Sequence, residues 1–208
     1  MKIIDWWLRN RRSYPWRKTS DPYKIAIAEI MLQRTRADQV LPIYLSFIKK
    51  FPTITDLAKA SEVEISYFFR KLGLFWRAGL VKKMANFVVK EYRGTFPKDL
   101  KSLIKIPAIG EYISRAILSF AYGKRVVVID SNICRIVKRI FGIEVSGEAR
   151  RNRDIQRLAE KLLPSEIESK FINWALIDFS ALICKPSRPS CEICPIRNCC
   201  NYFKMQDA

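Results

Sequence analysis

The sequence predicts an all-α fold, and three observations support this prediction. Apolar residues recur at helical spacing along most of the 208 residues. Only seven glycines are present, so few positions favour sharp turns. The apolar–polar alternation of a half-buried strand is nearly absent, and the one β-branched run, 126–129, is short enough to be a buried crossing between helices. We therefore expect helices joined by short connections.

Four segments are expected to be helical, and three of them show the helical period. The first, 25–31, is apolar on most sides. The others carry apolar residues at Leu80, Met84, Phe87 and Val88, then from Ile113 to Ala121 and from Ile133 to Phe141. Such spacing places these residues on one helix face, which packs into a core. Prolines and glycines mark the connections, and we expect about ten helices with no internal repeats.

The segment 103–112 stands out between two of these helical patterns. We expect Pro107 to end the first helix, Gly110 to allow a tight turn and Glu111 to open the next helix. The unpaired N–H groups at the start of that second helix would then form a seat for a phosphate. Any hairpin of two helices can carry the same proline and glycine, so a purely structural turn remains the alternative.

The charge balance indicates the kind of partner. Lysine and arginine number 38 against 20 acidic residues, which gives a formal charge of +18. A chain this basic, without a transmembrane run, lipidation motif or secretory signal, most often binds a polyanion such as nucleic acid. A merely basic surface is the alternative, although 49% hydrophobic residues are enough for a substantial core. Histidine is absent, so acid–base chemistry must rest on Asp, Glu, Lys, Tyr or Cys.

Five of the six cysteines lie within 184–200, and their spacing indicates a metal centre. Six, two and five residues separate the members of the expected ligand set, Cys184, Cys191, Cys194 and Cys200. Four thiolates can hold one zinc ion or a four-iron cluster, and zinc usually shows two C-x2-C pairs where this chain has one. Disulfides are a further alternative. The spacing favours a [4Fe-4S] cluster, with Cys199 as a spare because adjacent residues cannot easily reach one cluster.

The order of the hairpin, the run Val128-Ile-Asp-Ser-Asn132 and the cysteine block resembles the helix-hairpin-helix DNA glycosylases of the endonuclease III superfamily. The resemblance extends from about Trp6 to Tyr202. Within that superfamily, three further segments are similar to the MutY branch and to the thymine–DNA mismatch glycosylases: Pro15-Trp-Arg17, Ala28-Glu-Ile-Met-Leu-Gln33 and Phe96-Pro97.

The resemblance implies a two-lobed fold. One lobe, 23–126, would be a six-helix barrel with the helix-hairpin-helix motif. The other, formed by 1–22 and 127–208, would be a helical domain with the cluster loop 184–200. Double-stranded DNA would bind between them.

Two acidic side chains are candidates for catalysis. Asp130 follows an apolar run and precedes a basic amphipathic helix, so a helix N-cap is its simplest role. The resemblance assigns it the catalytic carboxylate, with Asn132 as a polar companion, and the two roles are compatible. Glu29 lies on an apolar helix, where a carboxyl group tends to stay protonated to higher pH. An isolated Glu is usually a surface residue, but the resemblance implies that Glu29 assists the departing base.

Tyr112 stands where bifunctional relatives carry the lysine that forms a Schiff base with the sugar. A phenol cannot form that imine, so the resemblance implies a hydrolase that does not nick the strand. A core aromatic on the hairpin helix is the alternative.

The resemblance also implies which residues contact DNA. Gln33 would enter the gap that a flipped nucleotide leaves, and Leu74 in the turn 73–77 would act as a wedge, although the neighbouring Phe75 and Trp76 suit a core equally well. The hairpin would contribute Pro107, Ile109 and Gly110. The cysteine loop would bring phosphate contacts from its basic residues, Lys185, Arg188 and Arg197.

The sequence departs from the family pattern in two places. The hairpin has Ala108 where a glycine is usual, and one methyl group is a small obstacle to a phosphate. The chain also ends soon after the cysteine block, so we expect no further domain of the kind that recognises oxidised guanine in full-length MutY enzymes.

The segments 33–35, 73–75 and 178–184 are closer to the mismatch branch than to MutY. We therefore expect removal of thymine or uracil opposite guanine, by a monomer in the cytoplasm of a prokaryotic cell, associated with the nucleoid. Adenine removal and an inactive, cluster-stabilised DNA-binding protein are the alternatives.

Overall fold

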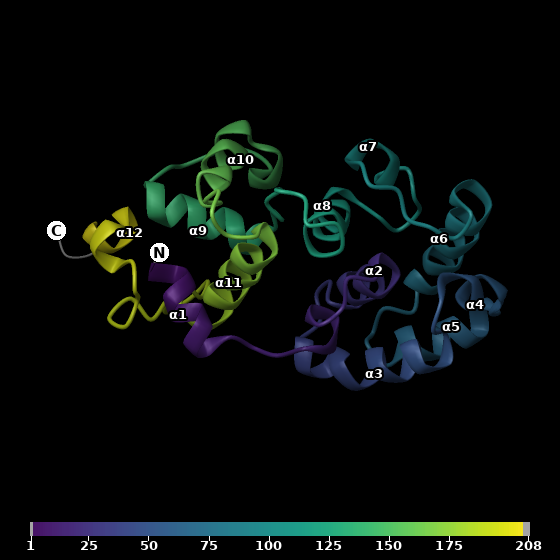
Figure 1. Ribbon diagram of the computed structural model, residues 1–208. Helices are drawn as coiled ribbons and strands as arrows, with labels where there is room; N and C mark the ends of the chain where they lie inside the picture. The colour runs from purple at the N-terminus through teal and green to yellow at the C-terminus, as the bar shows by residue number, and fades with distance from the viewer. Residues whose placement is uncertain (1, 206–208) are drawn as a thin grey trace. The chain divides into compact units, whose positions relative to one another are not determined.

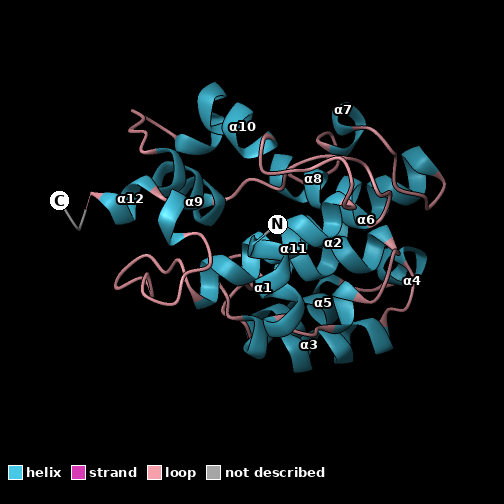
Figure 2. Ribbon diagram, turned by 60° about the vertical axis from the view of Figure 1, so that its left-hand side comes forward, coloured by secondary structure: helices cyan, strands magenta, loops and turns pink. Residues whose placement is uncertain are grey.

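The computed structural model describes residues 2–205 and is built from helices and loops, with no strand in that range (Figure 1, Figure 2). The α-helices are α1 (Lys2–Asn10), α2 (Pro22–Met31), α3 (Ala37–Lys50), α4 (Ile54–Lys59), α5 (Glu62–Arg70), α6 (Arg77–Tyr92), α7 (Leu100–Leu103), α8 (Glu111–Phe120), α9 (Ser131–Phe141), α10 (Arg153–Glu160), α11 (Ser169–Leu182) and α12 (Asn201–Lys204). The all-α prediction is confirmed. Among these helices none is long and apolar enough to cross a membrane.

The chain folds into two compact units. The central unit is formed by residues 13–122, and the terminal unit by 1–12 together with 123–208. The first boundary lies ten residues before the one expected from the sequence, because aromatic packing holds 13–22 in the central unit. Trp16 stacks on Tyr14 with ring centroids 4.7 Å apart and meets the edge of Tyr44 at 5.2 Å.

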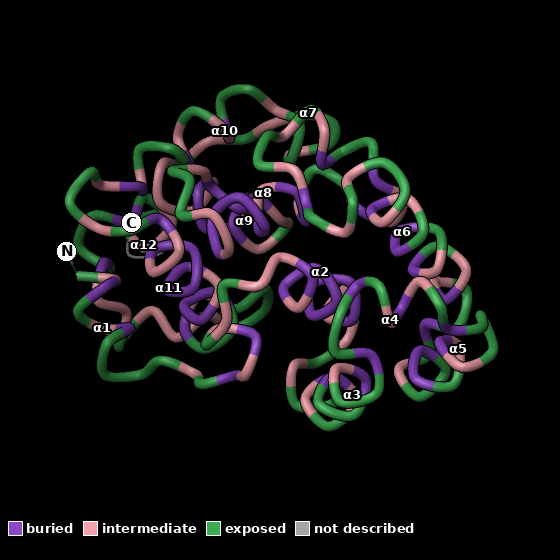
Figure 3. The backbone as a smooth tube through the Cα atoms, turned by 45° about the vertical axis from the view of Figure 1, so that its right-hand side comes forward, coloured by how far each residue is buried: buried purple, intermediate pink, exposed green. Residues whose placement is uncertain are grey.

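In the central unit, α2 is the innermost helix and packs against α8 and α3. All but two of its residues, Pro22 and Lys24, are buried, and Figure 3 shows the buried colour along its length. A helix that is apolar on nearly all sides is expected inside a core. In the same unit, α4 and α5 each start with a capping box, at Thr53 and Ser61. Both short helices therefore begin at defined positions.

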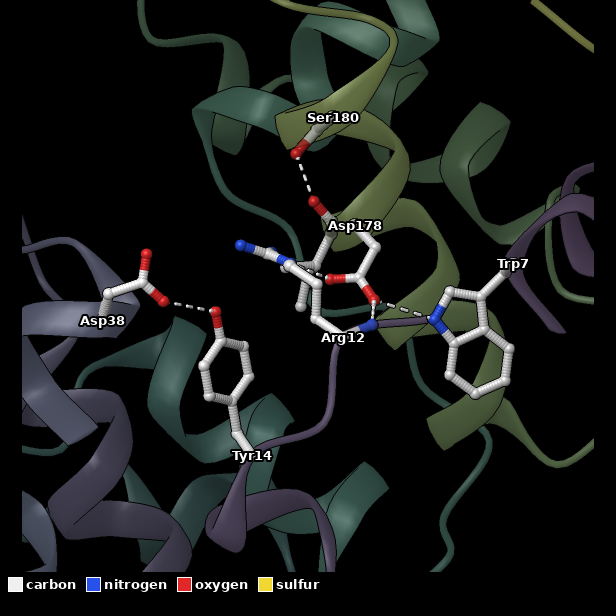
Figure 4. Close-up of polar contacts among 7 residues, drawn as sticks. Trp7, Arg12, Tyr14, Asp38, Asp178 and Ser180 are labelled. Atoms are coloured by element: carbon white, nitrogen blue, oxygen red, sulfur yellow. Dashed lines mark hydrogen bonds and ion pairs between the residues drawn. The ribbon is translucent and has the colours of Figure 1, made fainter. Parts of the chain in front are cut away.

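In the terminal unit, the buried carboxylate of Asp178 on α11 holds the N-terminal segment (Figure 4). It accepts hydrogen bonds from the Trp7 indole at 2.9 Å, from the Arg12 backbone N–H at 3.2 Å and from Arg12 Nε at 2.7 Å. These donors satisfy a charge that is completely shielded from solvent. In the central unit, Tyr14 donates to Asp38 at 3.2 Å, which fastens the start of that unit to α3 (Figure 4).

The hairpin before α8 corrects two sequence-based predictions. The helix α7 ends at Leu103, four residues before Pro107, so Pro107 does not terminate it. The left-handed residue of the turn is Ala108, with φ of 66°, whereas Gly110 is extended with φ of −80° and caps α8. Gly110 is therefore not required by the backbone conformation, while Ala108 adopts a conformation that favours glycine.

Candidate active site

Asp130 is positioned by the buried run that precedes it. Val127, Val128 and Ile129 are buried but form no strand. Asn173 of α11 binds two backbone groups of this segment, because its side chain accepts from the Val128 N–H at 3.0 Å and donates to the Val126 carbonyl at 2.9 Å. The expected buried crossing between helices is present, and one amide side chain supplies two of the hydrogen bonds that a neighbouring strand would otherwise provide.

The carboxylate of Asp130 has a donor on each oxygen. Oδ1 accepts from the Ile133 N–H at 2.8 Å, which makes Asp130 the N-cap of α9. Oδ2 accepts from the Asn132 side-chain amide at 2.7 Å. The N-cap interpretation is confirmed, and Asn132 lies beside the same carboxylate. Two fixed donors hold the group in one orientation, which suits a residue that stabilises a nearby positive charge.

Arg135 connects Asn132 to the cysteine-rich segment. Its Nη1 donates to Asn132 Oδ1 at 2.9 Å. On its other side, the guanidinium donates to the Cys184 carbonyl at 2.9 and 3.1 Å and to the Ser180 carbonyl at 3.2 Å. A continuous set of hydrogen bonds therefore runs from Asp130 to the backbone of the first cysteine of the block.

Four cysteines line one cavity in the terminal unit, and they are those expected from the spacing: Cys184, Cys191, Cys194 and Cys200. Cys199 does not line it and is exposed. All six cysteines are free thiols, so the disulfide alternative has no support. Arg139 of α9 reaches this segment as well, with Nη1 3.4 Å from Cys184 Sγ and 2.6 Å from the Lys185 carbonyl.

The cysteine arrangement differs from a site for one ion. Within 2–205, no three potential ligands are close enough together to hold a single metal ion. Burial, with a smaller effect of repulsion from the other three thiols of the cavity, raises the pKa of Cys194 to about 11. Four thiols that line one cavity are a donor set of the kind that holds a metal centre.

The central unit contains the second candidate catalytic group. Glu29 is buried on α2, with 6% of its surface exposed. Tyr112, half-buried in the first turn of α8, donates from its hydroxyl to Glu29 Oε2 at 3.0 Å. The packing of α2 against α8 thus joins two residues 83 positions apart in the sequence. A phenol that donates a hydrogen bond to a buried carboxyl group can hold that carboxyl group in one orientation, and the phenol proton then lies between the two oxygens.

The predicted wedge residue is not available at the surface. Leu74 is buried, with 3% of its surface exposed, so the structure gives no support to its prediction as a wedge. The next two side chains, Phe75 and Trp76, are 58% and 54% exposed and contact each other edge to face at 5.5 Å. The core alternative for this aromatic pair is therefore wrong. Gln33 lies half-buried in the turn after α2.

The remaining predicted DNA contacts are divided between exposed and buried positions. Ile109 is buried, so only its backbone can face a ligand, and its N–H already donates to Ile106. Gly110 is exposed and Pro107 is half-exposed, at the start of α8. In the cysteine segment, all three basic side chains named from the sequence are exposed: Lys185, Arg188 and Arg197.

Sequence reasoning missed the arginines that connect these elements. Arg135 and Arg139 stand four residues apart on α9, a spacing that places both on one face. That spacing, on the helix that Asp130 caps, is the signal that could have pointed to them. It could not have identified their carbonyl acceptors, which lie more than 40 residues later in the chain.

Comparison with known proteins agrees with this geometry. A family model described as HhH-GPD superfamily base excision DNA repair protein matches residues 27–165. A thymine/uracil-DNA glycosylase of Methanothermobacter thermautotrophicus is 36% identical over 203 residues, covering 97% of this chain and 91% of the relative. An adenine DNA glycosylase of Buchnera aphidicola is 36% identical over 206 residues, covering 97% of this chain but 57% of the relative.

Among solved structures, a thermostable thymine-DNA glycosylase superposes with a TM-score of 0.92 at 35% identity, covering 98% of this chain and 94% of that chain. The family match spans both candidate carboxylates, and these relatives extend over nearly all of the present sequence. The chain belongs to the HhH-GPD superfamily of base excision DNA repair proteins.

Proposed function

We propose that this protein is a monofunctional DNA glycosylase that hydrolyses the N-glycosidic bond of thymine or uracil mispaired with guanine. Membership of a base excision repair superfamily supports glycosylase chemistry. Two relatives with high coverage of both chains are a thymine/uracil-DNA glycosylase and a thymine-DNA glycosylase. Asp130 in the terminal unit and the Glu29–Tyr112 pair in the central unit support the same chemistry.

Asp130 would stabilise the sugar. Cleavage of an N-glycosidic bond passes through an oxocarbenium-like state, and an oriented carboxylate opposes its positive charge. The N-cap bond and the Asn132 amide hold Asp130 in place. Because both donors keep the carboxylate in one orientation, the residue is suited to electrostatic stabilisation.

The hydrogen bond from Tyr112 to Glu29 is the observation that most strongly supports the monofunctional mechanism. Glu29 is buried in a core helix, where a carboxyl group can carry a proton for the departing base. Tyr112 occupies the place of an imine-forming lysine and instead donates to that carboxyl group. The attacking group is therefore water, and the product is an abasic site in an intact strand.

The cysteine cavity would hold a [4Fe-4S] cluster through Cys184, Cys191, Cys194 and Cys200. Such a cluster, when bound, cross-links the segment in which these cysteines lie. The protein residues around it then present the exposed Lys185 and Arg188 to DNA phosphates. Arg139 binds the Lys185 and Pro186 carbonyls and fixes the first part of this segment.

A net charge of +18 supports double-stranded DNA as the partner. We propose that the protein works as a monomer on nucleoid DNA in the cytoplasm of a prokaryotic cell. A mispaired thymine or uracil suits the mechanism, since weak pairing lowers the cost of flipping. Removal of adenine is the second candidate, favoured by the 36% identity to an adenine DNA glycosylase.

A base-release assay tests the proposal. Purified protein is incubated with duplexes containing G·T, G·U and adenine opposite oxidised guanine, and the freed base is measured by chromatography. We expect thymine and uracil from the first two and no adenine from the third. Release of adenine alone would favour the second candidate. Tight binding without any release would indicate an inactive DNA-binding protein.

Asp130→Asn is the matched control for that assay. Asparagine caps helices as well as aspartate does, so α9 should keep its start. We expect this variant to bind DNA normally and to release no base. Loss of folding in proportion to loss of activity would mean that Asp130 is only a cap.

A further inference from the structure

One arginine near the end of α9 contacts both ends of the cysteine set. Arg139 Nη1 donates to the sulfur of Cys184 at 3.4 Å. The backbone carbonyl of the same arginine accepts from the sulfur of Cys200 at 3.3 Å. Cys184 and Cys200 are the first and last of the four cysteines that line the cavity, and Arg139 lines it with them. A single residue of α9 therefore reaches two candidate ligand sulfurs.

The rest of the Arg139 guanidinium is held by neutral groups. Its Nη1 also donates to the Lys185 carbonyl at 2.6 Å, and its Nη2 donates to the Pro186 carbonyl at 2.9 Å. Its Cζ atom lies 4.5 Å from the centre of the Tyr202 ring, which is a cation–π contact. Within 2–205, no carboxylate forms an ion pair with this arginine. The positive charge is thus oriented by its neighbours, and no carboxylate of that range neutralises it.

A charged donor beside a ligand sulfur has a specific effect on a metal centre. Arg135, one turn earlier on α9, binds the backbone carbonyl of Cys184, whereas Arg139 binds its sulfur. A cysteine that ligates a metal does so as a thiolate, and a thiolate accepts strongly from a charged N–H group. Hydrogen bonds to the ligand sulfurs and the local charge both set the reduction potential of an iron–sulfur cluster. Arg139 supplies both of these influences at once.

We propose that Arg139 is a positioning residue for the [4Fe-4S] cluster, which retains the iron and raises the reduction potential through a charged hydrogen bond to the Cys184 thiolate. A cation beside a ligand sulfur stabilises the more negatively charged, reduced state of the cluster relative to the oxidised state. The bonds to the carbonyls of 185 and 186 keep the guanidinium beside that sulfur. This inference rests on the part of the proposed function that assigns a cluster to the cysteine cavity.

Two properties of the purified, iron-loaded protein test this role without any assay of base release. They are the rate at which iron passes to a chelator and the potential of the one-electron couple of the cluster, measured by voltammetry. In Arg139→Gln, iron should be lost about 10–100-fold faster, the usual effect of removing a group that orients a metal ligand. The potential should become more negative, because the charge beside the thiolate is gone. Arg139→Lys keeps the charge without the planar fork of donors, so it should keep most of the potential and lose iron at an intermediate rate.

Two matched controls remove one positive charge from the same region. Lys138 precedes Arg139 on α9, but it pairs with Glu144 at 2.9 Å and does not line the cysteine cavity. Arg197 lines the cavity, and its Nη1 donates to the Glu192 carbonyl at 3.0 Å. We expect Lys138→Gln and Arg197→Gln to leave the potential and the rate of iron loss unchanged. An equal shift in either control would reduce the result to loss of net charge and overturn the proposal.

Other outcomes would also contradict the role of Arg139. An unchanged potential in Arg139→Gln, with faster loss of iron, would mean that the arginine only fixes the backbone of the cysteine segment. If Arg139→Gln takes up no iron, Arg139→Lys carries the test, and iron loss from it at the unaltered rate would overturn the proposal.

Failure of the cluster assignment is distinguished by the unaltered protein. Zinc or no metal in that protein would refute the cluster, and this inference with it. Four irons in the unaltered protein, with no shift in either Arg139 variant, would refute only the role of Arg139. Thymine release is scored separately on G·T duplexes, so the glycosylase proposal does not depend on either result.

Discussion

The guanidinium of Arg135 donates two hydrogen bonds to the carbonyl oxygen of Cys184, at 2.9 and 3.1 Å. The same side chain donates to Asn132, which in turn donates to Asp130. The candidate catalytic carboxylate and the first residue of the cysteine block are therefore joined by two side chains. A displacement of the cysteine segment should therefore change the position of the Asp130 carboxylate through these hydrogen bonds.

Arg135→Gln tests that connection. The shorter amide cannot reach Asn132 and both carbonyls, so the Cys184 carbonyl loses its donor, at a cost of about 1–3 kcal/mol in unfolding free energy. Loss of a group that orients a site typically lowers activity about 10–100-fold. We expect a lower kcat with little change in DNA affinity, measured by single-turnover kinetics and by binding. Arg157→Gln, an exposed arginine on α10, should change neither quantity.

The hairpin before α8 yields a paired prediction about stability and DNA binding. Ala108 is left-handed, so Ala108→Gly should relieve strain and change the unfolding free energy by about +1 kcal/mol or less, after the entropy of glycine is subtracted. Denaturant titration measures this change. A clear loss of stability in Ala108→Gly would contradict the strain at this position.

Gly110→Ala should affect DNA binding and leave stability unchanged. The backbone at Gly110 accepts any residue, and an added Cβ would meet nothing within 4 Å. Stability should therefore be unchanged, while affinity for DNA should fall if a phosphate approaches this N-terminus of α8. Unchanged affinity would remove Gly110 from the DNA contacts.

The cysteine cavity predicts which thiols are needed for the cluster. Purified protein should be yellow-brown and contain about four irons per chain, as a cubane held by four thiolates requires. Cys199→Ser should keep colour and iron, because Cys199 is exposed and does not line the cavity, and Cys200→Ser should lose both. One zinc and no iron, or the reverse pattern in the two variants, would refute the assignment.

Replacement of Asp178, which is outside the candidate site, should have a large effect on stability. Asp178→Asn removes the charge that Arg12 binds, and breaking a buried ion pair typically costs about 3–5 kcal/mol. Because the Arg12 side chain is 29% exposed, we expect the lower end of that range in the unfolding free energy. Asp154→Asn, whose partner Arg157 is largely exposed, should cost less than about 1 kcal/mol. Equal effects would mean that Asp178 does not hold the N-terminal segment.

The sequence predicted those features that depend on local pattern. The apolar period located the later helices: α6 and α9 contain the segments named from it, and α8 contains all but the last residue, Ala121, of its segment. Asp130 was identified as an N-cap because the residue type and its place before an amphipathic helix are sufficient. Cysteine spacing alone separated Cys199 from the four thiols that line the cavity.

Features that depend on the packed backbone could not be predicted. In the turn 73–77, Leu74 and Phe75 are equally apolar in sequence, and only the path of the chain places one inside and the other outside. The tight turn was expected at Gly110 because glycine has no Cβ, yet the left-handed residue of the hairpin is Ala108. The bonds of Arg135 to Cys184 span 49 residues, beyond the reach of any local pattern.

The central claim is that bases are released by water, with Tyr112 and Glu29 acting as a hydrogen-bonded pair in place of an amine nucleophile. Glu29→Gln should lower the rate about 10²–10⁴-fold, the usual effect of losing an acid–base group. Tyr112→Lys should introduce some strand nicking, because an amine would then replace the phenol.

The most direct measurement is a single-turnover reaction on a G·T duplex, with and without borohydride. We predict free thymine, a strand that breaks only on later alkali treatment, and no covalent protein–DNA adduct. Strand cleavage together with borohydride trapping by the unaltered protein would contradict the account.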